Sequence, residues 1–285
     1  MTLPVTVGID GSGAAERALG WAAAEAELRH VSLDIVHAAQ LVTVPPGVPP
    51  TTSMNAALAA QCRKWLDEAV TVVKEVAPEV RVTTELIDDG VLDALTRRSS
   101  QAQLLVLGSR GIGGFAELLA GSVAVALCAH ARCPVAVVRG AIPSPDAPVV
   151  VGIDGSPTSD AALAFAMNEA SLRSVPLVAY HSWSDTSHEP GMQRQPFVLD
   201  WSAIREAEEG VLTERLAGWQ QRYREVEVRH VVERNRPAHG LIRQSASAQL
   251  VVVGSRGRGG LAGMLLGSTS HALIHHAACP VVVAR

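Results

Sequence analysis

VTVGIDGS, residues 5–12, is repeated as VVVGIDGS at residues 149–156, and the architecture that we expect follows from this repeat. Each copy is a short apolar run that ends in Gly-Ile-Asp-Gly-Ser, as expected for a strand that is buried on both faces and leads into a helix. Towards the end of each copy, LLVLGSRGIGG (residues 104–114) matches LVVVGSRGRGG (residues 250–260). Two pairs of related segments in the same order indicate that one domain occurs twice.

The repeat also predicts the domain limits. We expect domains at residues 1–140 and 147–285, joined by a proline-containing linker at residues 139–148. A chain of 285 residues is long enough for two domains that each bury a core.

The composition narrows the choice of partners. The formal net charge is −4 and the 24 basic residues are spread along the chain, so we expect no nucleic-acid partner. No apolar run is long enough to cross a bilayer and the first residues do not resemble a secretion signal, so we expect no membrane partner and a cytoplasmic location. The four cysteines form no CxxC pair, and we expect reduced, mostly buried thiols.

Strand and helix patterns alternate within each copy. In the first copy we expect strands at 5–9, 33–37, 80–86, 104–107 and 135–138, and helices at 14–29, 56–76 and 93–99. In the second copy we expect strands at 149–153, 177–181, 226–232, 250–253 and 281–284, and helices at 159–173, 203–223 and 241–247. Residues 40–53 and 182–200 receive no regular structure. This alternation predicts an α/β fold with a five-stranded, mostly parallel sheet in each domain.

Two glycine-containing motifs lie where strands are expected to end, which is where open α/β sheets bind ligands. The first motif is Gly8-Ile9-Asp10-Gly11-Ser12, and the second is Gly108-Ser109-Arg110-Gly111 followed, after nine residues, by Gly121-Ser122. The second copy repeats both motifs with the same spacing, at residues 152–156, 254–257 and 267–268.

Glycines let backbone N–H groups approach an anion without steric clash, and a helix that begins at Gly121-Ser122 or Gly267-Ser268 adds further donors. Lys64 and Lys74 are the only lysines and neither follows a glycine-rich loop, which excludes a P-loop. The motif therefore predicts an anion site without lysine.

Side chains in the two motifs add to this site. Arg110 and Arg256 can contribute positive charge, and the Ser122 and Ser268 hydroxyls can contact a terminal phosphate or a metal-bound water. Asp10 and Asp154 can accept hydrogen bonds from ribose hydroxyls or a ligand amine, or hold a metal through water. The alternative is that the glycines only mark loops and that Asp10 only caps a helix; two copies at the same place in the fold favour the ligand site.

The GxxG motif, the nine-residue spacing to Gly-Ser, the strand-one aspartate and the final Cys-Pro-Val strand together resemble the nucleotide-binding universal stress protein family. The resemblance covers nearly the whole chain. It implies two sheets of strand order 3-2-1-4-5 with helices on both faces, an adenine-nucleotide α-hydrolase-like fold, and one ATP site, with Mg²⁺, in each domain. It places the adenine near Asp10 and Ala38 in the first domain and near Asp154 and Ser182 in the second.

The other nucleotide-binding positions that we expect follow the same motif in each domain. In the first domain they are Gly8, Gly108, Ser109, Arg110, Gly111, Gly113, Gly114, Gly121, Ser122 and Val123. In the second domain they are Gly152, Gly254, Ser255, Arg256, Gly257, Gly259, Gly260, Gly267, Ser268 and Thr269. Domains of the family pair through their last strands, which implies an internal pseudo-dimer of residues 135–138 with residues 281–284 and allows a homodimer.

Three functions remain open. The first is an ATP-binding stress or regulatory protein that acts on a protein partner which the sequence does not identify. The second is an enzyme for ATP hydrolysis or for phosphoryl or adenylyl transfer, for which we expect slow or no turnover because no general base stands out. The third is an assembly platform in which the motif is a relic. His130 with Cys133, and His276 with Cys279, provide too few ligands for zinc, and we expect His37 and His181 to be buried and hydrogen-bonded.

Overall fold

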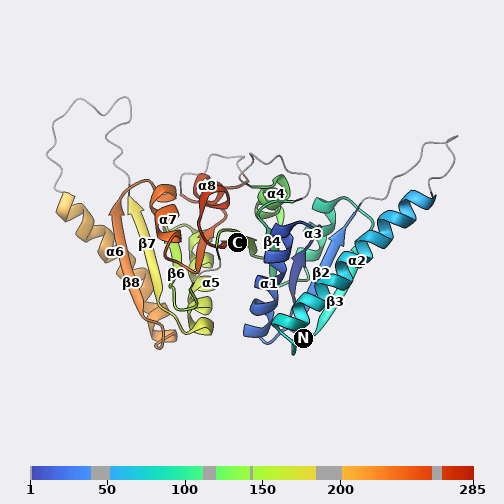
Figure 1. Ribbon diagram of the computed structural model, residues 1–285. Coiled ribbons are helices and arrows are strands. Elements are labelled where there is room, and N and C mark those ends of the chain that lie inside the picture. The colour runs from blue at the N-terminus through green and yellow to red at the C-terminus, as the bar shows by residue number, and fades with distance from the viewer. Residues whose placement is uncertain (1, 40–51, 112–119, 142–143, 184–200, 259–264) are drawn as a thin grey trace, which may run out of the picture. The chain divides into compact units, whose positions relative to one another are not determined.

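The computed structural model describes residues 2–39, 52–111, 120–141, 144–183, 201–258 and 265–285. Contacts between Cα atoms divide the chain into two compact units, Met1–Arg139 and Gly140–Arg285. The helices and strands of both units are labelled in Figure 1.

The first unit is built on a parallel five-stranded sheet. Its strands are β1 (Val5–Gly8), β2 (Leu33–Ala38), β3 (Val82–Ile87), β4 (Leu104–Gly108) and β5 (Val135–Val138). They pair in the order β3-β2-β1-β4-β5. Its helices are α1 (Gly13–Leu28), α2 (Thr52–Val76), α3 (Val91–Ser99) and α4 (Ser122–His130).

The second unit repeats this arrangement. Its strands are β6 (Val149–Ile153), β7 (Leu177–Trp183), β8 (Val228–Arg234), β9 (Leu250–Gly254) and β10 (Val281–Ala284). They pair in parallel in the order β8-β7-β6-β9-β10. Its helices are α5 (Pro157–Arg173), α6 (Trp201–Arg222), α7 (Pro237–Ser245) and α8 (Ser268–His276). The expected α/β class and the order 3-2-1-4-5 are confirmed in each unit.

The strand order fixes where a ligand can enter. Connections between parallel strands are right-handed, so the two helices that lead outwards from the first strand cover one face of the sheet and the later two cover the other. Consistent with this, α1 packs on α2, α3 packs on α4, and α7 packs on α8. Strands two and three are added on one side of the first strand, and strands four and five are added on its other side. The carboxyl ends of the first and fourth strands therefore form the switch point at which such sheets bind ligands.

The core of each unit consists of the central strands and the small side chains that cover them. Val5, Val7 and the β4 residues Leu104–Val106 are fully buried, as are Val149 and Val151 in the second unit. α1 covers its sheet with alanines such as Ala18 and Ala22, whose short side chains let the helix axis approach the strands closely.

Several element limits differ from the expected ones for local reasons. α5 begins at Pro157 rather than at residue 159, and α7 begins at Pro237 rather than at residue 241. Proline is well suited to the first turn of a helix, where its missing N–H costs no hydrogen bond. β7 continues to Trp183, so Ser182 and Trp183 belong to a strand and not to an irregular segment. α2 begins at Thr52 rather than at residue 56, and residues 40–51 and 184–200 lie outside the described residues.

A buried ion pair ties the first helix of each unit to the sheet. The Glu169 carboxylate is fully buried, and Arg173, one helical turn later, pairs with it at 3.0 Å. Arg173 Nη1 also donates to Gln249 Oε1 at 3.2 Å, just before β9. Glu25 and Arg29 form the same pair in α1, at 2.6 Å. Breaking such a pair would leave an uncompensated buried charge, which is strongly destabilising.

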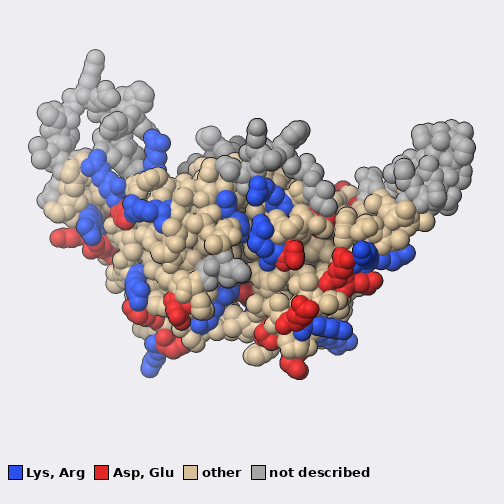
Figure 2. All heavy atoms as spheres, in the orientation of Figure 1, with Lys and Arg blue, Asp and Glu red and all other residues tan. Residues whose placement is uncertain are grey.

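The surfaces of the two units carry both signs of charge. Figure 2 shows basic and acidic side chains on the visible face of each unit. Among the described residues, no helix has the length and apolarity needed to cross a membrane.

Gly240, inside α7, supplies a stability test. A Cβ atom there would lie 1.7 Å from the hydroxyl of the fully buried Tyr180, so Gly240→Ala forces this ring to move. We expect the free energy of unfolding to fall by about 1–3 kcal/mol in urea denaturation. Gly210→Ala in α6 is the matched control, because nothing lies within 4 Å of its Cβ position, and it should raise stability by up to about 1 kcal/mol. Equal effects of the two substitutions would contradict the steric argument.

Candidate functional site

A cavity of about 640 Å³ opens at the carboxyl ends of β6, β7 and β9 in the second unit. Its lining includes nine of the residues expected to bind nucleotide: Gly152, Asp154, Ser182, Gly254, Arg256, Gly257, Gly267, Ser268 and Thr269. Residues from both glycine motifs and from the end of β7 therefore meet in one space.

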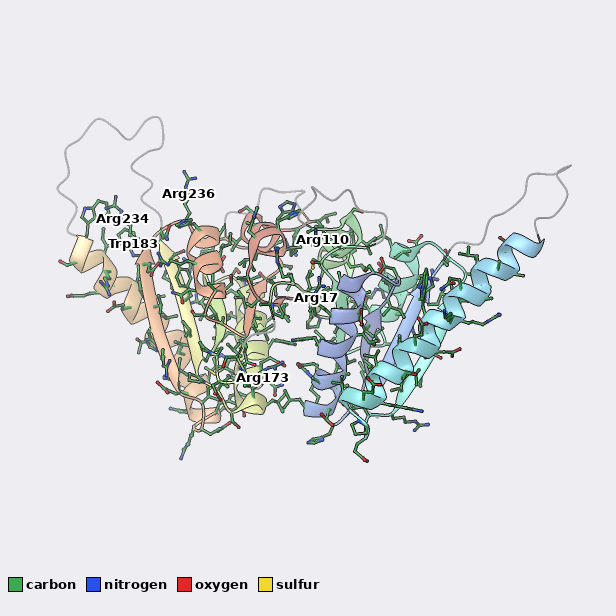
Figure 3. The ribbon with its side chains drawn as sticks, in the orientation of Figure 1. Arg17, Arg110, Arg173, Trp183, Arg234 and Arg236 are labelled. Carbon is green, nitrogen blue, oxygen red and sulfur yellow. The ribbon has the colours of Figure 1, made fainter. Side chains whose placement is uncertain are left out.

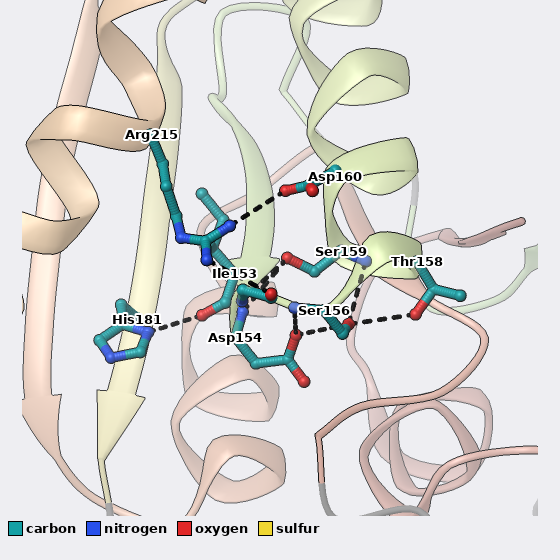
Figure 4. Close-up of polar contacts among 9 residues, drawn as sticks. Ile153, Asp154, Ser156, Thr158, Ser159, Asp160, His181 and Arg215 are labelled. Carbon is teal, nitrogen blue, oxygen red and sulfur yellow. Dashed lines mark hydrogen bonds and ion pairs between the residues drawn. The ribbon is translucent and has the colours of Figure 1, made fainter.

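Asp154 organises the turn between β6 and α5 (Figure 4). Its Oδ1 accepts hydrogen bonds from the backbone N–H and the hydroxyl of Ser156, at 2.9 and 2.7 Å, and its Oδ2 accepts one from the backbone N–H of Arg258 at 3.0 Å. Partial burial alone would raise the pKa of Asp154, but these hydrogen bonds and the charge of Arg258 outweigh it and lower the pKa below the ordinary 3.8. Asp154 is therefore a carboxylate that joins the two motifs.

The glycines of the loop after β9 are required by close contacts. A Cβ atom on Gly257 would lie 2.5 Å from Asp154 Oδ2, and one on Gly254 would lie 2.7 Å from the backbone carbonyl carbon of Thr158. The Thr158 hydroxyl in turn donates to the carbonyl oxygen of Arg256 at 2.6 Å. The loop therefore packs against the start of α5 through its backbone, because the contacting positions are glycines or a carbonyl oxygen.

Two of the helices beside the cavity, α5 and α8, begin differently. Ser156 caps α5, because its side chain accepts a hydrogen bond from the Ser159 N–H. α8 begins after Gly267 with no side-chain cap, and the N–H groups of its first turn have no partner within the helix. An N-terminus of this kind attracts anions through its donors and its dipole. Gly267 itself donates to the Ser255 carbonyl at 2.8 Å, which fixes the helix start beside the loop.

The first unit contains the same contacts around Asp10. Its Oδ1 accepts the Ser12 N–H at 3.0 Å, and a Cβ atom on Gly111 would lie 2.5 Å from its Oδ2. Ser12 caps α1, and α4 begins after Gly121 without a side-chain cap, as α8 does. The serine caps and the helix starts at Ser122 and Ser268 agree with the expected positions.

Some expected site residues lie elsewhere. Ser255 does not line the cavity, and its N–H donates to the Ala284 carbonyl at 3.0 Å; the Ser109 N–H donates to Val138 in the same way. The other expected positions of the first unit lie at strand ends (Gly8, Ala38, Gly108), in the loop after β4 (Arg110, Gly111) and at the start of α4 (Ser122, Val123). Gly113, Gly114, Gly259 and Gly260 lie outside the described residues.

Further residues line the cavity that the motifs did not indicate. Tyr180 and Trp183 come from β7, Glu208 comes from α6, and Arg258 follows the glycine loop. Arg258 could have been found from its place in the repeated motif. Glu208 is separated from the motifs in sequence, and only the packing of α6 brings it to His181, at 3.0 Å.

The two strand-end histidines are buried and hydrogen-bonded, as expected. His37 Nδ1 lies 2.7 Å from the Ile9 carbonyl oxygen, and His181 Nδ1 lies 2.7 Å from that of Ile153. Each links the end of the second strand to the end of the first. The second nitrogen of His181 contacts Glu208, whereas the His37 ring packs edge-on against Trp65.

Within the described part of the chain, no three or more His, Cys, Asp or Glu side chains are grouped so that they could hold a metal ion.

Fold and site together define a protein of two α/β units, each with glycine motifs at the switch point of its sheet. The family model described as the universal stress protein family matches residues 1–139 and 147–285, and the chain belongs to this family. It is 45% identical over 292 residues to universal stress protein Rv2005c of Mycobacterium tuberculosis strain H37Rv, covering 99% of this chain and 96% of that protein. It is 43% identical over 300 residues to universal stress protein Rv2623 of the same strain, covering 100% and 97%.

The fold is also similar to a solved structure. A universal stress protein from Archaeoglobus fulgidus DSM 4304 has a TM-score of 0.72 and 18% identity, covering 99% of this chain and 98% of that one. At this identity the likeness is one of fold.

The lowered pKa of Asp154 predicts a pH-dependent stability. A carboxyl group whose pKa is lower in the folded than in the unfolded state stabilises the protein above its unfolded value, and this contribution is lost as the pH falls through the folded pKa. The stability lost in Asp154→Asn should therefore be largest above about pH 5 and should shrink as the pH falls below 3.8. Urea denaturation at pH 6, 4 and 3 measures it, with replacement of the exposed Asp146 by Asn as control. A constant difference across these pH values would contradict the assignment.

Proposed function

We propose that each unit binds one ATP molecule and that the protein acts as a nucleotide-dependent stress or regulatory module. The observation that carries this proposal is the cavity of the second unit, where a glycine loop, an uncapped helix start and a strand-end carboxylate line one space. A volume of about 640 Å³ lies within the range of small-molecule sites. Family membership supports the same reading for both units.

The phosphates fit the end of the cavity at α8. The backbone N–H groups of Ser268 and Thr269 lie in the uncapped first turn, and Arg256 adds a positive charge on the cavity wall. These donors suit a polyanion, because each N–H or guanidinium hydrogen bond to a charged oxygen is stronger than one to a neutral acceptor. Mg²⁺ would enter with the phosphates, within reach of the Ser268 hydroxyl.

The nucleoside fits the end of the cavity at β6 and β7. Asp154 lies at the end of β6, where its remaining lone pairs can accept a ribose hydroxyl, and the backbone of Ser182 lies at the end of β7 beside it. Asp10 and Ala38 take the corresponding places in the first unit.

We propose binding rather than rapid turnover. Both oxygens of Asp154 already accept hydrogen bonds, and its pKa is lowered, which makes this carboxylate a weak general base. A regulatory role needs only that the protein with nucleotide differs in conformation or partner choice from the protein without it.

The proposal includes the domain limits 1–140 and 147–285, pairing of the domains within the chain, and a cytoplasmic location. The location accords with the four cysteines, Cys62, Cys128, Cys133 and Cys279, which are buried and form no disulfide. The domain limits and the pairing rest on the repeat and on family membership.

Nucleotide content tests the proposal most directly. Freshly purified protein is denatured, and the released nucleotides are separated by chromatography and counted per chain. About two adenine nucleotides per chain are expected, and the ratio of ATP to ADP over time reports turnover. Absence of released nucleotide, together with no binding heat on adding ATP and magnesium, would overturn the proposal.

Single-site variants assign the sites. A Cβ atom on Gly121 would lie no closer than 3.6 Å to the protein, over the loop at Ser109–Gly111, so Gly121→Asp places a carboxylate beside the phosphates without disturbing the fold. Gly267→Asp is the corresponding variant of the second unit, where a Cβ atom would lie 3.3 Å from Arg256 Cα, so the loop must shift by a few tenths of an ångström to accept it. Each variant should reduce the ATP stoichiometry from about two to about one in calorimetry, because the new negative charge repels the phosphates.

Gly218→Asp in α6 is the control for an added charge, since its Cβ position is open, and it should leave the stoichiometry at two. Gly108→Glu is a poorer choice, because a Cβ atom on Gly108 would lie 2.6 Å from the Ala14 backbone and would disturb the fold as well as the site. Unchanged stoichiometry in both aspartate variants would mean that ATP binds elsewhere.

A further inference from the structure

The two units differ at the carboxyl ends of their second and third strands. In β7 and β8 the last paired positions are Ser182 with Glu233 and Trp183 with Arg234. In the first unit the last such pair is Ala38 with Ile87, and Ala39 follows. At the end of the second strand, Ser182 and Trp183 therefore stand where the first unit has Ala38 and Ala39.

Trp183 is held in place by a stack of side chains. The Trp183 ring stacks on the Trp201 ring, with 5.6 Å between their centroids. The Arg234 guanidinium carbon lies over the Trp201 ring, 3.9 Å from its centroid. Figure 3 shows Trp183 and Arg234 at the same end of the second unit, where β7 and β8 end. Stacking and cation–π attraction limit the rotamers that Trp183 can adopt.

Two buried polar atoms at this end of the cavity have no hydrogen-bond partner among the described residues. They are Trp183 Nε1 and Ser182 Oγ, and both residues line the cavity. The Ser182 side chain lies near the Tyr180 phenol, but without the geometry of a hydrogen bond. The indole N–H can only donate, and leaving it buried and unpaired is unfavourable. A ligand atom that accepts a hydrogen bond would remove this cost, and because the two atoms are buried it must first displace the groups that cover them.

Tyr180 adds an acceptor next to them. Its hydroxyl donates to Glu233 at 3.3 Å, and burial, together with the negative charge of Glu233, raises its pKa to about 12, so it stays protonated. Because its proton points to Glu233, the oxygen keeps lone pairs for another donor. Trp183, Ser182 and Tyr180 together offer one donor, one group of either kind and one acceptor, which suits the edge of a purine base.

We propose that the second unit recognises the base of its nucleotide through the Trp183 indole N–H and the Ser182 hydroxyl, whereas Ala38 and Ala39 at the corresponding positions of the first unit offer neither group. The two sites then differ in affinity, with the second the tighter. This inference rests on the ATP binding proposed above and names the side chains that make the two sites unequal.

The test uses the full chain with the first site disabled by Gly121→Asp. In this background, Trp183→Phe keeps the aromatic ring and removes the N–H, and Ser182→Ala introduces the residue found at position 38 of the first unit. Each should raise the dissociation constant for ATP by about two- to tenfold, as expected for one lost hydrogen bond. Trp219→Phe is the matched control, because Trp219 stacks on Tyr223 and does not line the cavity. It should leave the constant unchanged.

A second test, by NMR, detects contact with the Trp183 indole directly and needs no dissociation constant. The indole N–H resonance of Trp183, assigned by its absence in Trp183→Phe, should shift on addition of ATP to the wild-type chain, and that of Trp219 should not. In the Gly267→Asp background, which disables the second site, Trp183→Phe should not change the affinity of the first.

The outcomes separate this inference from the proposed function. If ATP binds with a stoichiometry of two but neither variant weakens it and the Trp183 resonance stays in place, base recognition by these side chains is wrong and ATP binding stands. If no ATP binds to either unit, both proposals are wrong.

Discussion

In each unit, the helix that follows the first strand passes so close to the end of the fourth strand that only glycine fits between them. A Cβ atom would meet the backbone of Ala14 or Thr158 at 2.6–2.7 Å, and a backbone cannot move aside cheaply. This contact brings the loop after the fourth strand over the strand-one aspartate, where a second glycine is required. The position of the candidate site therefore depends on the absence of two side chains in each unit.

The helices of each unit begin in two ways: α1 and α5 have a serine side-chain cap, whereas α4 and α8, where we propose that phosphates bind, have none. Ser12 and Ser156 satisfy the first turns of α1 and α5 from within the protein. Gly121 and Gly267 cannot do so, and the first turns of α4 and α8 face the loop uncapped. The hydrogen bonds that lower the pKa of Asp154 also hold the turn in shape, and they leave lone pairs on both of its oxygens for the ligand that we propose. A structural role for the aspartates is thus compatible with ligand binding.

Features carried by local sequence were predictable, and features carried by packing were not. The buried β-branched runs predicted the central strands, the repeat predicted two copies, and the Gly-Ser sequences predicted where α4 and α8 begin. The strand order came from the family resemblance. The ends of β7 and β8 were missed, because their last residues are polar or aromatic and pair only in the folded sheet. The stack of Trp183 on Trp201 joins a strand to a helix beyond residues 184–200, and no periodicity in the sequence indicates it.

The last strand of each sheet also touches the glycine loop, since the Val138 and Ala284 carbonyls accept the N–H groups of Ser109 and Ser255. A purification tag or reporter fused after Arg285 would begin two residues beyond Ala284, which makes the second of these hydrogen bonds, at the end of the sheet where the cavity opens. The first strand starts at the other end of the sheet, where the Pro4 carbonyl accepts the Gln103 N–H. A fusion before the first strand would therefore start at the end of the sheet opposite the glycine loop, and a fusion after the last strand would start at the same end as the loop.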